Sequence, residues 1–248
     1  MKKQVTEKPT TFKRLSIIIP CYNELENIEP VLDAVGKVDV LGLEKEIIVV
    51  DDGSIDGTIE VLKEVRGKFK GSDLLKIHFS MLNQGKGTAI RIGLAYATGE
   101  VIIIQDADLE YDPRDYPKLI EPIIKGEADV VYGSRFLGKA GRLKGMGWSN
   151  FAANKILAFL ATILYGRRIT DEATCYKAFR ADVIKNINLV CRRFEFCPEV
   201  TAKVLKKKYK LIEVPISYEG RTSLEGKKIT WRDGFEAIWT IIKWRFRR

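Results

Sequence analysis

An apolar run that ends in two closely spaced aspartates constrains this chain more than any other stretch. Val101 to Ile104 are all valine or isoleucine, and Asp106 and Asp108 follow almost at once. Such a run is typical of a strand buried on both faces of a sheet, and ionised carboxylates do not belong in that core. Both aspartates are therefore expected on a loop at the carboxyl end of the strand, where they could bind one Mg²⁺ or Mn²⁺ ion. Taken alone, the same residues also fit a solvated acidic turn.

Strands and helices alternate over the first half of the chain. Compact apolar runs that end in polar residues predict five strands, at 15–19, 47–50, 75–82, 101–105 and 128–132. Between them, apolar residues recur at helical spacing, as at positions 28, 31, 32 and 35. This alternation predicts an α/β fold with a mainly parallel sheet that helices cover on both faces. A chain of 248 residues is long enough for one such domain.

Polar residues follow the first four predicted strands at one edge of the sheet. They are Tyr22 and Glu24, Asp51 and Asp52, Asn83 and Lys86, and Asp106 and Asp108. In an open parallel sheet, the carboxyl ends of the strands form the crevice that binds ligands. The sequence lacks both common phosphate-binding loops, because Gly85-Lys86-Gly87 is not a Walker loop and Gly53-Ser54 lacks the G-x-G-x-x-G spacing. The edge therefore favours a nucleotide that is held through a cation.

The net charge of +9 is concentrated near the C-terminus. Residues 203–248 carry thirteen Lys and Arg against five Asp and Glu. A basic segment of this kind favours a polyanionic partner such as a nucleic acid, a phosphorylated substrate or an anionic membrane surface, although a solvated face has the same composition. We expect no nucleic acid partner, since no recognised binding motif is present and the sheet-edge carboxylates would repel a phosphate backbone.

The beginning of the chain and its cysteines predict a cytoplasmic protein. Residues 1–14 form a polar extension without the apolar segment of a secretory signal. The four cysteines show neither C-x-x-C nor zinc-type spacing, so reduced thiols are expected. His78 is the single histidine and lies in an expected strand, which favours a structural role and argues against catalysis by histidine.

Two apolar stretches suggest contact with a membrane surface. The stretch 148–165 is interrupted by Asn150, Asn154 and Lys155, whereas a membrane span needs about 20 mainly apolar residues. An amphipathic helix in the interface and ordinary core packing explain it about equally well. The stretch 231–248 combines tryptophans with Lys and Arg, which suits a lipid headgroup boundary. We therefore expect a peripheral protein at the inner leaflet of the cytoplasmic membrane, with no spanning helix.

Several motifs together resemble family 2 glycosyltransferases, which have the GT-A fold with a Rossmann-like sheet. Those of the nucleotide-sugar half are Ser16-Ile-Ile-Ile-Pro-Cys-Tyr-Asn-Glu24, Val49-Val-Asp-Asp-Gly-Ser54, Asn83-Gln-Gly-Lys-Gly87 and Asp106-Ala-Asp108. Three further motifs are similar to the branch that contains dolichol-phosphate mannose synthase and other polyprenyl-phosphate sugar transferases. They are Gly133-Ser-Arg135, the segment 170–180, and Arg221 followed by Lys227-Lys228-Ile229-x-Trp231-x-Asp233-Gly234. Each motif is weak alone, but the ordered set, which spans about residues 15–240, is specific.

The resemblance implies a single catalytic domain over residues 15–248. Its parts would be a nucleotide-sugar half at 15–133, an acceptor half at 134–230 and a basic amphipathic C-terminal helix at 231–248. The residues implied to bind the nucleotide sugar are Pro20, Tyr22, Glu24, Asp52, Asn83, Lys86 and Asp106.

Metal and phosphate contacts are implied in the same way. Asp106 and Asp108 would hold Mg²⁺ or Mn²⁺ on the diphosphate, with Glu110, where some relatives have Gln, as a further ligand. Arg135 would approach the acceptor phosphate. The residues implied to close over the phosphates are Arg221, Lys227 and Lys228. Lys227 stands where the mannose synthases tend to have Ser, so which of the two lysines faces the site stays open.

The acceptor follows from the need for a general base. A hydroxyl acceptor requires a carboxylate to remove its proton, whereas a lipid phosphate is already ionised at neutral pH. Thr174-Cys175-Tyr176 stands where many relatives that glycosylate hydroxyls have an acidic base, and the nearest carboxylates are Asp171 and Glu172. We interpret Asp171 as a positioning member of a catalytic set that also contains Asp108 and Arg135.

The predicted activity is inverting, metal-dependent transfer of a hexose to a polyprenyl or dolichyl phosphate. The donor would be a nucleotide sugar of the GDP-mannose or UDP-glucose type. One alternative is transfer to a sugar hydroxyl in polysaccharide or glycolipid synthesis. A more remote alternative is a polyanion-binding module without enzymatic activity.

Overall fold

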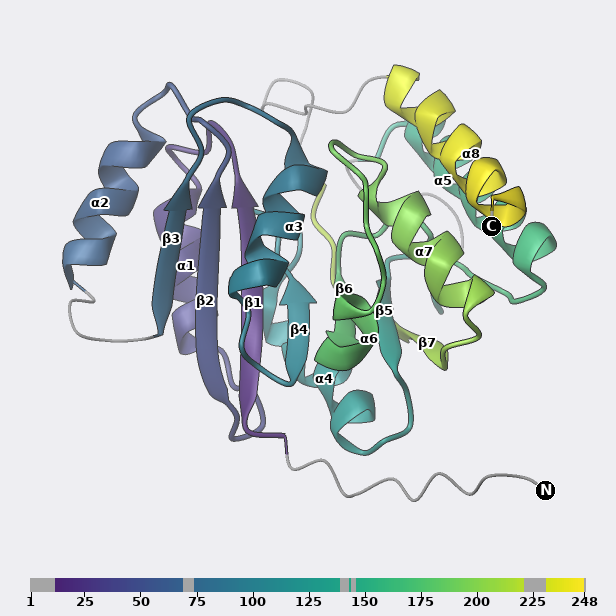
Figure 1. The fold of residues 1–248 in the computed structure, drawn as a ribbon, viewed down its shortest axis with the longest axis horizontal. Helices are drawn as coiled ribbons and strands as arrows, with labels where there is room; N and C mark the ends of the chain where they lie inside the picture. Colours follow the sequence, from purple (N-terminus) through teal and green to yellow (C-terminus); the bar gives the residue numbers. More distant parts are fainter. Residues whose placement is uncertain (1–11, 69–73, 139–142, 144–145, 221–230, 248) are drawn as a thin grey trace.

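A seven-stranded sheet forms the centre of the fold (Figure 1). The computed structural model describes residues 12–68, 74–138, 143, 146–220 and 231–247. In sheet order the strands are β3 (Leu75–Phe79), β2 (Glu44–Asp51), β1 (Arg14–Cys21), β4 (Val101–Ile104), β6 (Lys177–Arg180), β5 (Val130–Ser134) and β7 (Leu211–Pro215). The pairings are parallel except for those of β6, which runs antiparallel to both β4 and β5. The predicted α/β fold with a mainly parallel sheet is confirmed.

Helices cover both faces of the sheet, as predicted. They are α1 (Ile28–Lys37), α2 (Thr58–Lys68), α3 (Lys86–Tyr96), the 3₁₀ turn η1 (Pro113–Asp115), α4 (Tyr116–Ile124), α5 (Trp148–Tyr165), α6 (Ala181–Lys185), α7 (Phe196–Lys206) and α8 (Trp231–Phe246). Alternate residues of β1 point to opposite faces, so Ile17 and Ile19 pack with α1 and α4 while Ile18 packs with α3. Burial of apolar side chains on both faces therefore produces two cores, separated by the sheet.

The central strands explain why the expected site lies at their carboxyl ends. Every side chain of β4 is fully buried, which leaves no room for a carboxylate before the strand ends at Ile104.

The early end of β4 also explains why Pro20 is tolerated in the central strand β1. The Ile18 carbonyl accepts a hydrogen bond from the Gln105 N–H at 2.9 Å, on the side of β4. Pro20 faces the same side two residues later, where β4 has ended, so its missing N–H leaves no ladder bond unmade.

Two strands of the second half of the sheet, β6 and β7, were not predicted from the sequence. β6 has only four residues and begins and ends with the charged Lys177 and Arg180, which hides its apolar character. Helix α7 was also missed. The boundaries of the five predicted strands differ by one to three residues at an end, and the largest differences are that β2 begins at Glu44 and β3 ends at Phe79.

Helices α5, α7 and α8 pack together beside β5 and β7 (Figure 1). Leu157, Ala158 and Ala161 of α5 are buried, and the Tyr165 hydroxyl at its end donates a hydrogen bond to the Ile241 carbonyl of α8 at 2.9 Å. Both apolar stretches are thus helices, as expected. Within the described ranges, no helix has the length and apolar character needed to cross a membrane.

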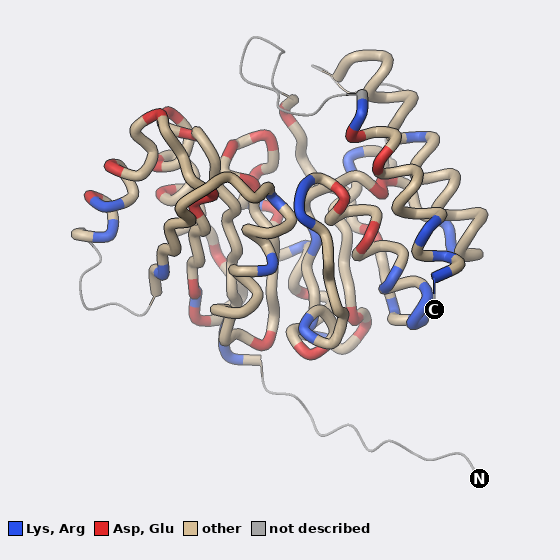
Figure 2. Tube along the Cα trace, turned by 45° about the horizontal axis from the view of Figure 1, so that its top comes forward, with Lys and Arg blue, Asp and Glu red and all other residues tan. Residues whose placement is uncertain are grey.

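Lys and Arg residues gather near the C-terminus, at the ends of α7 and α8 (Figure 2). A cation–π contact joins these helices, because Lys203 Nζ of α7 lies 3.6 Å from the Trp244 ring of α8. The guanidinium of Arg247, directly after α8, lies 5.1 Å from the same ring. The concentration of positive charge expected from the sequence is therefore a surface feature of this end of the molecule.

Candidate active site

The loops after β1 and β2 are fastened to each other at the carboxyl edge of the sheet. Asn23 has a φ of 51°, its N–H donates to Ser54 Oγ at 2.8 Å, and its Oδ1 accepts from the Ile55 N–H at 2.9 Å. Asp51 accepts hydrogen bonds from the N–H groups of Gly53 at 3.1 Å and Ser54 at 3.0 Å. This network fixes the backbone around the predicted nucleotide-binding residues Tyr22 and Glu24.

Asp52 fastens the third loop to the second. Its two carboxylate oxygens accept hydrogen bonds from the N–H groups of Gln84 at 2.9 Å and Gly85 at 2.6 Å. Burial raises the pKa of Asp52 although both N–H donors act in the opposite direction. In this structure the carboxylate therefore positions the loop at 83–87, and its implied contact with the nucleotide sugar stays a prediction.

Four more of the predicted nucleotide-binding residues lie at the same edge of the sheet, and they differ in how deeply they are buried. Pro20 and Glu24 are buried, and Glu24 Oε2 accepts a hydrogen bond from Asn27 Nδ2 at 2.8 Å. Tyr22 is half-buried, and Asn83 is exposed. Their contacts with a nucleotide stay predictions.

Lys86 and Asp106 form an ion pair between the third and fourth loops. Lys86 Nζ donates to Asp106 Oδ1 and also lies 3.1 Å from Cys175 Sγ. Burial alone would lower the pKa of Lys86, but the Asp106 carboxylate raises it well above its usual value. The ammonium group is therefore charged at neutral pH, and it joins the donor edge to the segment that carries Cys175.

The segment after β4 meets the chain that leaves β7. Asp108 is buried, and its Oδ1 accepts a hydrogen bond from the Glu110 N–H at 3.0 Å. The Glu110 carbonyl accepts from the Glu219 N–H at 3.0 Å, and its Oε2 accepts from the Tyr218 hydroxyl at 3.2 Å. The described chain thus reaches Gly220 next to the predicted metal ligands. The predicted phosphate-binding residues Arg221, Lys227 and Lys228 lie outside the described residues.

A divalent cation fits the chemistry of this edge if the substrate supplies part of its coordination. Asp106, Asp108 and Glu110 offer carboxylate oxygens, which Mg²⁺ and Mn²⁺ prefer. Across the described ranges, however, no three His, Cys, Asp or Glu side chains are grouped closely enough to hold a metal ion. Mg²⁺ is usually bound by one or two carboxylates together with substrate phosphates. The residues therefore fit a cation that binds with a diphosphate better than one held by a preformed set of three carboxylates.

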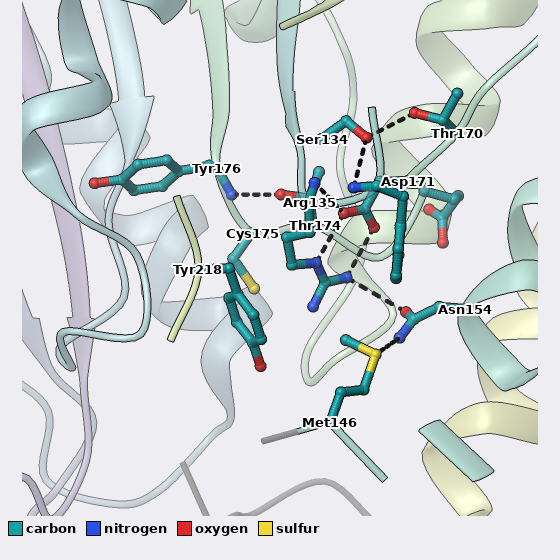
Figure 3. Close-up of polar contacts among 12 residues, drawn as sticks. Ser134, Arg135, Met146, Asn154, Thr170, Asp171, Thr174, Cys175, Tyr176 and Tyr218 are labelled. Carbon is teal, nitrogen blue, oxygen red and sulfur yellow. Dashed lines mark hydrogen bonds and ion pairs between the residues drawn. The ribbon is translucent and has the colours of Figure 1, made fainter. Parts of the chain in front are cut away.

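Arg135 is held at the end of β5 by Asp171 (Figure 3). The Arg135 Nε and Nη2 atoms donate to the two oxygens of Asp171 at 2.7 and 2.8 Å, and the Arg135 N–H donates to Oδ2 at 2.9 Å. Nη2 also contacts Asn154 Oδ1 of α5 at 3.4 Å. Both charged side chains are buried, and a bidentate pair of this kind is strong and geometrically specific. Asp171 thereby sets the direction in which the guanidinium points.

The other side of the Arg135 guanidinium faces aromatic rings and Cys175 (Figure 3). The Tyr218 ring centroid is 5.1 Å from the guanidinium carbon, and that of Tyr111 is 5.9 Å away. Tyr111 stacks on Tyr176 at 4.9 Å between ring centroids. Sequence reasoning missed these tyrosines and Asn154, and the position of Tyr111 directly after the acidic motif is the one sequence feature that could have indicated it.

Lys177 and the carboxyl group of Glu172, the residue after Asp171, are also buried. Lys177 of β6 is fully buried, donates to the carbonyls of Glu172 (2.8 Å) and Thr174, and lies 4.3 Å from the centroid of the Tyr132 ring. The Glu172 carboxyl group is also fully buried, and neither of its oxygens has a hydrogen-bond partner in the described part of the chain. Burial raises the pKa of Glu172 to about 8, against the opposing effect of Lys177. Glu172 is therefore mostly protonated at neutral pH.

Known proteins are similar to this chain in both sequence and fold. The family model described as glycosyl transferase family 2 matches residues 16–187. A dolichol-phosphate mannosyltransferase of Pyrococcus furiosus is 32% identical over 243 residues, which cover 93% of this chain and 64% of the relative. An undecaprenyl-phosphate 4-deoxy-4-formamido-L-arabinose transferase of Edwardsiella ictaluri is 28% identical over 218 residues, which cover 88% and 63%. The chain thus spans less than two thirds of the length of these curated relatives, which belong to the branch that the motifs resemble.

Among solved structures, the fold matches a glucosyl-3-phosphoglycerate synthase. The crystal structure of that enzyme from Mycobacterium tuberculosis in complex with Mn²⁺, UDP and phosphoglyceric acid aligns with a TM-score of 0.72. The alignment covers 95% of this chain and 80% of the synthase, at 17% identity, so it bears on the fold alone. The predicted GT-A architecture is thereby confirmed, and the chain belongs to glycosyl transferase family 2.

Proposed function

We propose that this chain is a glycosyltransferase that moves a hexose from a nucleotide sugar of the GDP-mannose or UDP-glucose type to a polyprenyl or dolichyl phosphate, with inversion at C1. The names of the two curated relatives, which contain dolichol phosphate and undecaprenyl phosphate, support a lipid phosphate as the acceptor. The observation that carries the proposal is the state of the carboxyl groups of Asp171, which binds Arg135, and of its neighbour in the chain, Glu172.

Neither of those carboxyl groups is suited to remove a proton from a hydroxyl acceptor. Both oxygens of Asp171 are engaged by Arg135 in a fully buried ion pair. Glu172 is also fully buried, and it is mostly protonated at neutral pH. A general base must be within hydrogen-bond reach of the proton that it removes. A phosphate monoester needs no base because it is already an anion, and Arg135 would orient it for attack on the sugar.

The donor would bind at the carboxyl edge of β1, β2 and β4. Asp106 and Asp108 would hold Mg²⁺ or Mn²⁺, which supplies charge neutralisation for the departing diphosphate. Lys86 would add a positive charge from the first turn of α3. Asp52 acts here by keeping the loop at 83–87 in place, and Tyr111 and Tyr218 would separate the donor edge from Arg135.

The outer faces of α5 and α8 support peripheral binding to the cytoplasmic leaflet. Ile156, Phe159 and Ile163 lie on one exposed face of α5, and Phe235 and Trp239 lie one turn apart on α8. Basic residues follow on the last turn of α8 and at its end, which suits an anionic lipid surface. A membrane-bound enzyme would meet its lipid acceptor at this surface, on the side of Arg135 that Asn154 of α5 contacts.

A transfer assay tests the proposed reaction. The purified protein is incubated with radiolabelled GDP-mannose, UDP-glucose or UDP-N-acetylglucosamine, each with undecaprenyl or dolichyl phosphate and with Mg²⁺ or Mn²⁺. We expect label in the lipid fraction with one of the donors. Label that appears only in a sugar acceptor offered in the same assay would favour the hydroxyl-acceptor alternative. A folded protein that transfers none of the sugars with either metal would refute the proposal.

Flotation with liposomes tests the membrane surface. We expect the protein to float with vesicles that contain anionic phospholipid at low salt, and the F235S/W239S variant to stay in the soluble fraction. Leu41→Ser is the matched control, because Leu41 is also exposed but precedes β2 at the opposite edge of the sheet. Equal flotation of all three proteins, or of none, would contradict the assignment of this surface.

A further inference from the structure

Lys86 is paired with a residue that is expected to bind the metal ion. Its Nζ forms an ion pair with Asp106 Oδ1, so one of the carboxylate oxygens needed by a cation is already engaged. We infer that Lys86 acts as an internal counter-ion for Asp106 and leaves it only when a nucleoside diphosphate arrives, so that metal and nucleotide bind cooperatively. The inference rests on the proposed metal-dependent donor site and assigns Lys86 a role in the order of binding.

The backbone that carries Lys86 is fixed on both sides. The N–H groups of Gly87 and Thr88 donate to the carbonyls of Arg193 at 3.0 Å and Arg192 at 2.9 Å. Gly85 has a φ of +97°, and a Cβ atom there would be 2.5 Å from the Arg192 carbonyl oxygen, so only glycine allows this approach. Lys86 can therefore change partner only by rotating its side chain, and it remains within reach of Asp106.

The ion pair is sheltered from water. The side chains of Lys86 and Asp106 are 20% and 14% exposed, whereas those of the surface pair Lys125 and Glu121 are 56% and 51% exposed. Cys175 Sγ closes the site at 3.1 Å from Lys86 Nζ. A sheltered pair attracts more strongly than an exposed one because solvent screens it less. A metal ion alone must therefore compete with a firmly held ammonium group for Asp106.

A diphosphate changes this competition. Its oxygens are good partners for a lysine ammonium, so Lys86 can move from the carboxylate to the phosphate without losing an anionic partner. Asp106 then offers both oxygens to the cation that accompanies the nucleotide. By thermodynamic linkage, each ligand increases the affinity for the other by the same factor. Lys86 thus links the metal and nucleotide sites through one side-chain rotation.

Titration of Mn²⁺ followed by electron paramagnetic resonance, which reports the free ion, tests the inference without any turnover. It is performed on the full chain alone, with GDP and with UDP. We expect weak Mn²⁺ binding by the wild type alone and affinity about tenfold or more higher with one of the nucleotides, a coupling of the size usual between sites. Lys86→Met should bind Mn²⁺ more tightly than the wild type without nucleotide, and its coupling factor should fall towards one.

Two further variants make the result specific. Lys86→Gln removes the charge but keeps a hydrogen-bond donor, so it serves if Lys86→Met does not fold, and it is expected to behave in the same way. Lys125→Met removes one positive charge from the exposed pair with Glu121 and should leave both affinities unchanged.

Three results would overturn the inference. The first is Mn²⁺ affinity in the Lys86 variants that is unchanged or weaker without nucleotide. The second is Mn²⁺ affinity in the Lys86 variants that rises by the same factor with and without nucleotide. Such a result would mean that removing the charge only strengthens metal binding in general and leaves the coupling between metal and nucleotide intact. In both cases coupling in the wild type would still support the proposed donor site. The third is wild type that binds no Mn²⁺ even with nucleotide, which would refute the metal site together with this inference.

Discussion

The buried carboxyl group of Glu172 makes the stability of the protein depend on pH in a way that one substitution should remove. Burial raises its pKa in the folded state to about 8, from 4.5 for an exposed glutamate. Because the folded pKa is the higher one, the stabilising contribution is fully present below pH 4.5 and is lost as the pH rises towards 8. Unfolding at neutral pH allows Glu172 to ionise, which favours the unfolded chain.

The size of the effect follows from these two pKa values. At 1.36 kcal/mol per pKa unit, the full effect approaches about 5 kcal/mol above pH 8. Between pH 5 and pH 7 the linkage relation gives a loss of about 2 to 3 kcal/mol from this one group. Glu172→Gln keeps the shape of the side chain and cannot ionise, so the variant should lack this loss.

Urea denaturation followed by tryptophan fluorescence at pH 5, 6, 7 and 8 measures the effect. The quantity of interest is the unfolding free energy of Glu172→Gln minus that of the wild type, in which the titration of all other groups largely cancels. We expect this difference to rise by about 2 to 3 kcal/mol between pH 5 and pH 7. Glu127→Gln is the matched control, because Glu127 is exposed, and its difference should stay flat. A flat difference for Glu172→Gln as well would mean that Glu172 is ionised beside Lys177, and the reasoning would be wrong.

Three other predictions concern the site. Arg135→Lys should lower kcat/KM for the lipid phosphate about 10- to 100-fold while the KM for the donor stays the same, because lysine cannot form the bidentate pair with Asp171. Gly87→Ala should lower the unfolding free energy by about 1 to 3 kcal/mol in urea denaturation, because the added Cβ atom would be 2.9 Å from the Arg193 carbonyl oxygen. Gly36→Ala in α1 is the control. A Cβ atom there would have nothing within 4 Å, so this substitution should stabilise the protein slightly. Chelation with EDTA should abolish transfer without changing the melting temperature, since the described residues form no preassembled three-residue metal site that would support the fold; a large fall in melting temperature would contradict this.

The sequence was most informative where structure depends on local pattern. The apolar runs of β1, β2 and β4 were sufficient to predict a parallel sheet, and the polar residues after them were sufficient to predict that these side chains lie along one edge of it. Short apolar strands that end in carboxylates have few other arrangements, because charge is excluded from the core. The same reasoning could not find β6, in which Lys177 lies inside the core and is compensated by backbone carbonyls from residues 172 and 174.

Pairings between distant residues were beyond local reasoning. Arg135 and Asp171 were both expected in the site, but their bidentate pair depends on the order β4-β6-β5-β7, which brings the segment after α5 beside the end of β5. The contact of Asp52 with the backbone at 84–85 likewise depends on how β2 and β3 end side by side. In both cases the residue had been named from the sequence, while its partner became evident only in three dimensions.

Three cations from three different elements hold the segment from Asp171 to Tyr176. Arg135 of the β5 end binds Asp171, Lys177 of β6 binds the carbonyls of Glu172 and Thr174, and Lys86 of α3 contacts Cys175. Asp171 and Asp106 compensate two of these charges, but Glu172 is mostly protonated at neutral pH and leaves Lys177 without a carboxylate counter-ion there. Three basic side chains therefore converge on the segment between the donor edge and Arg135. The proposed transfer would bring a diphosphate and a lipid phosphate together at this segment, and these side chains would offset the repulsion between the two anions until the sugar has been transferred.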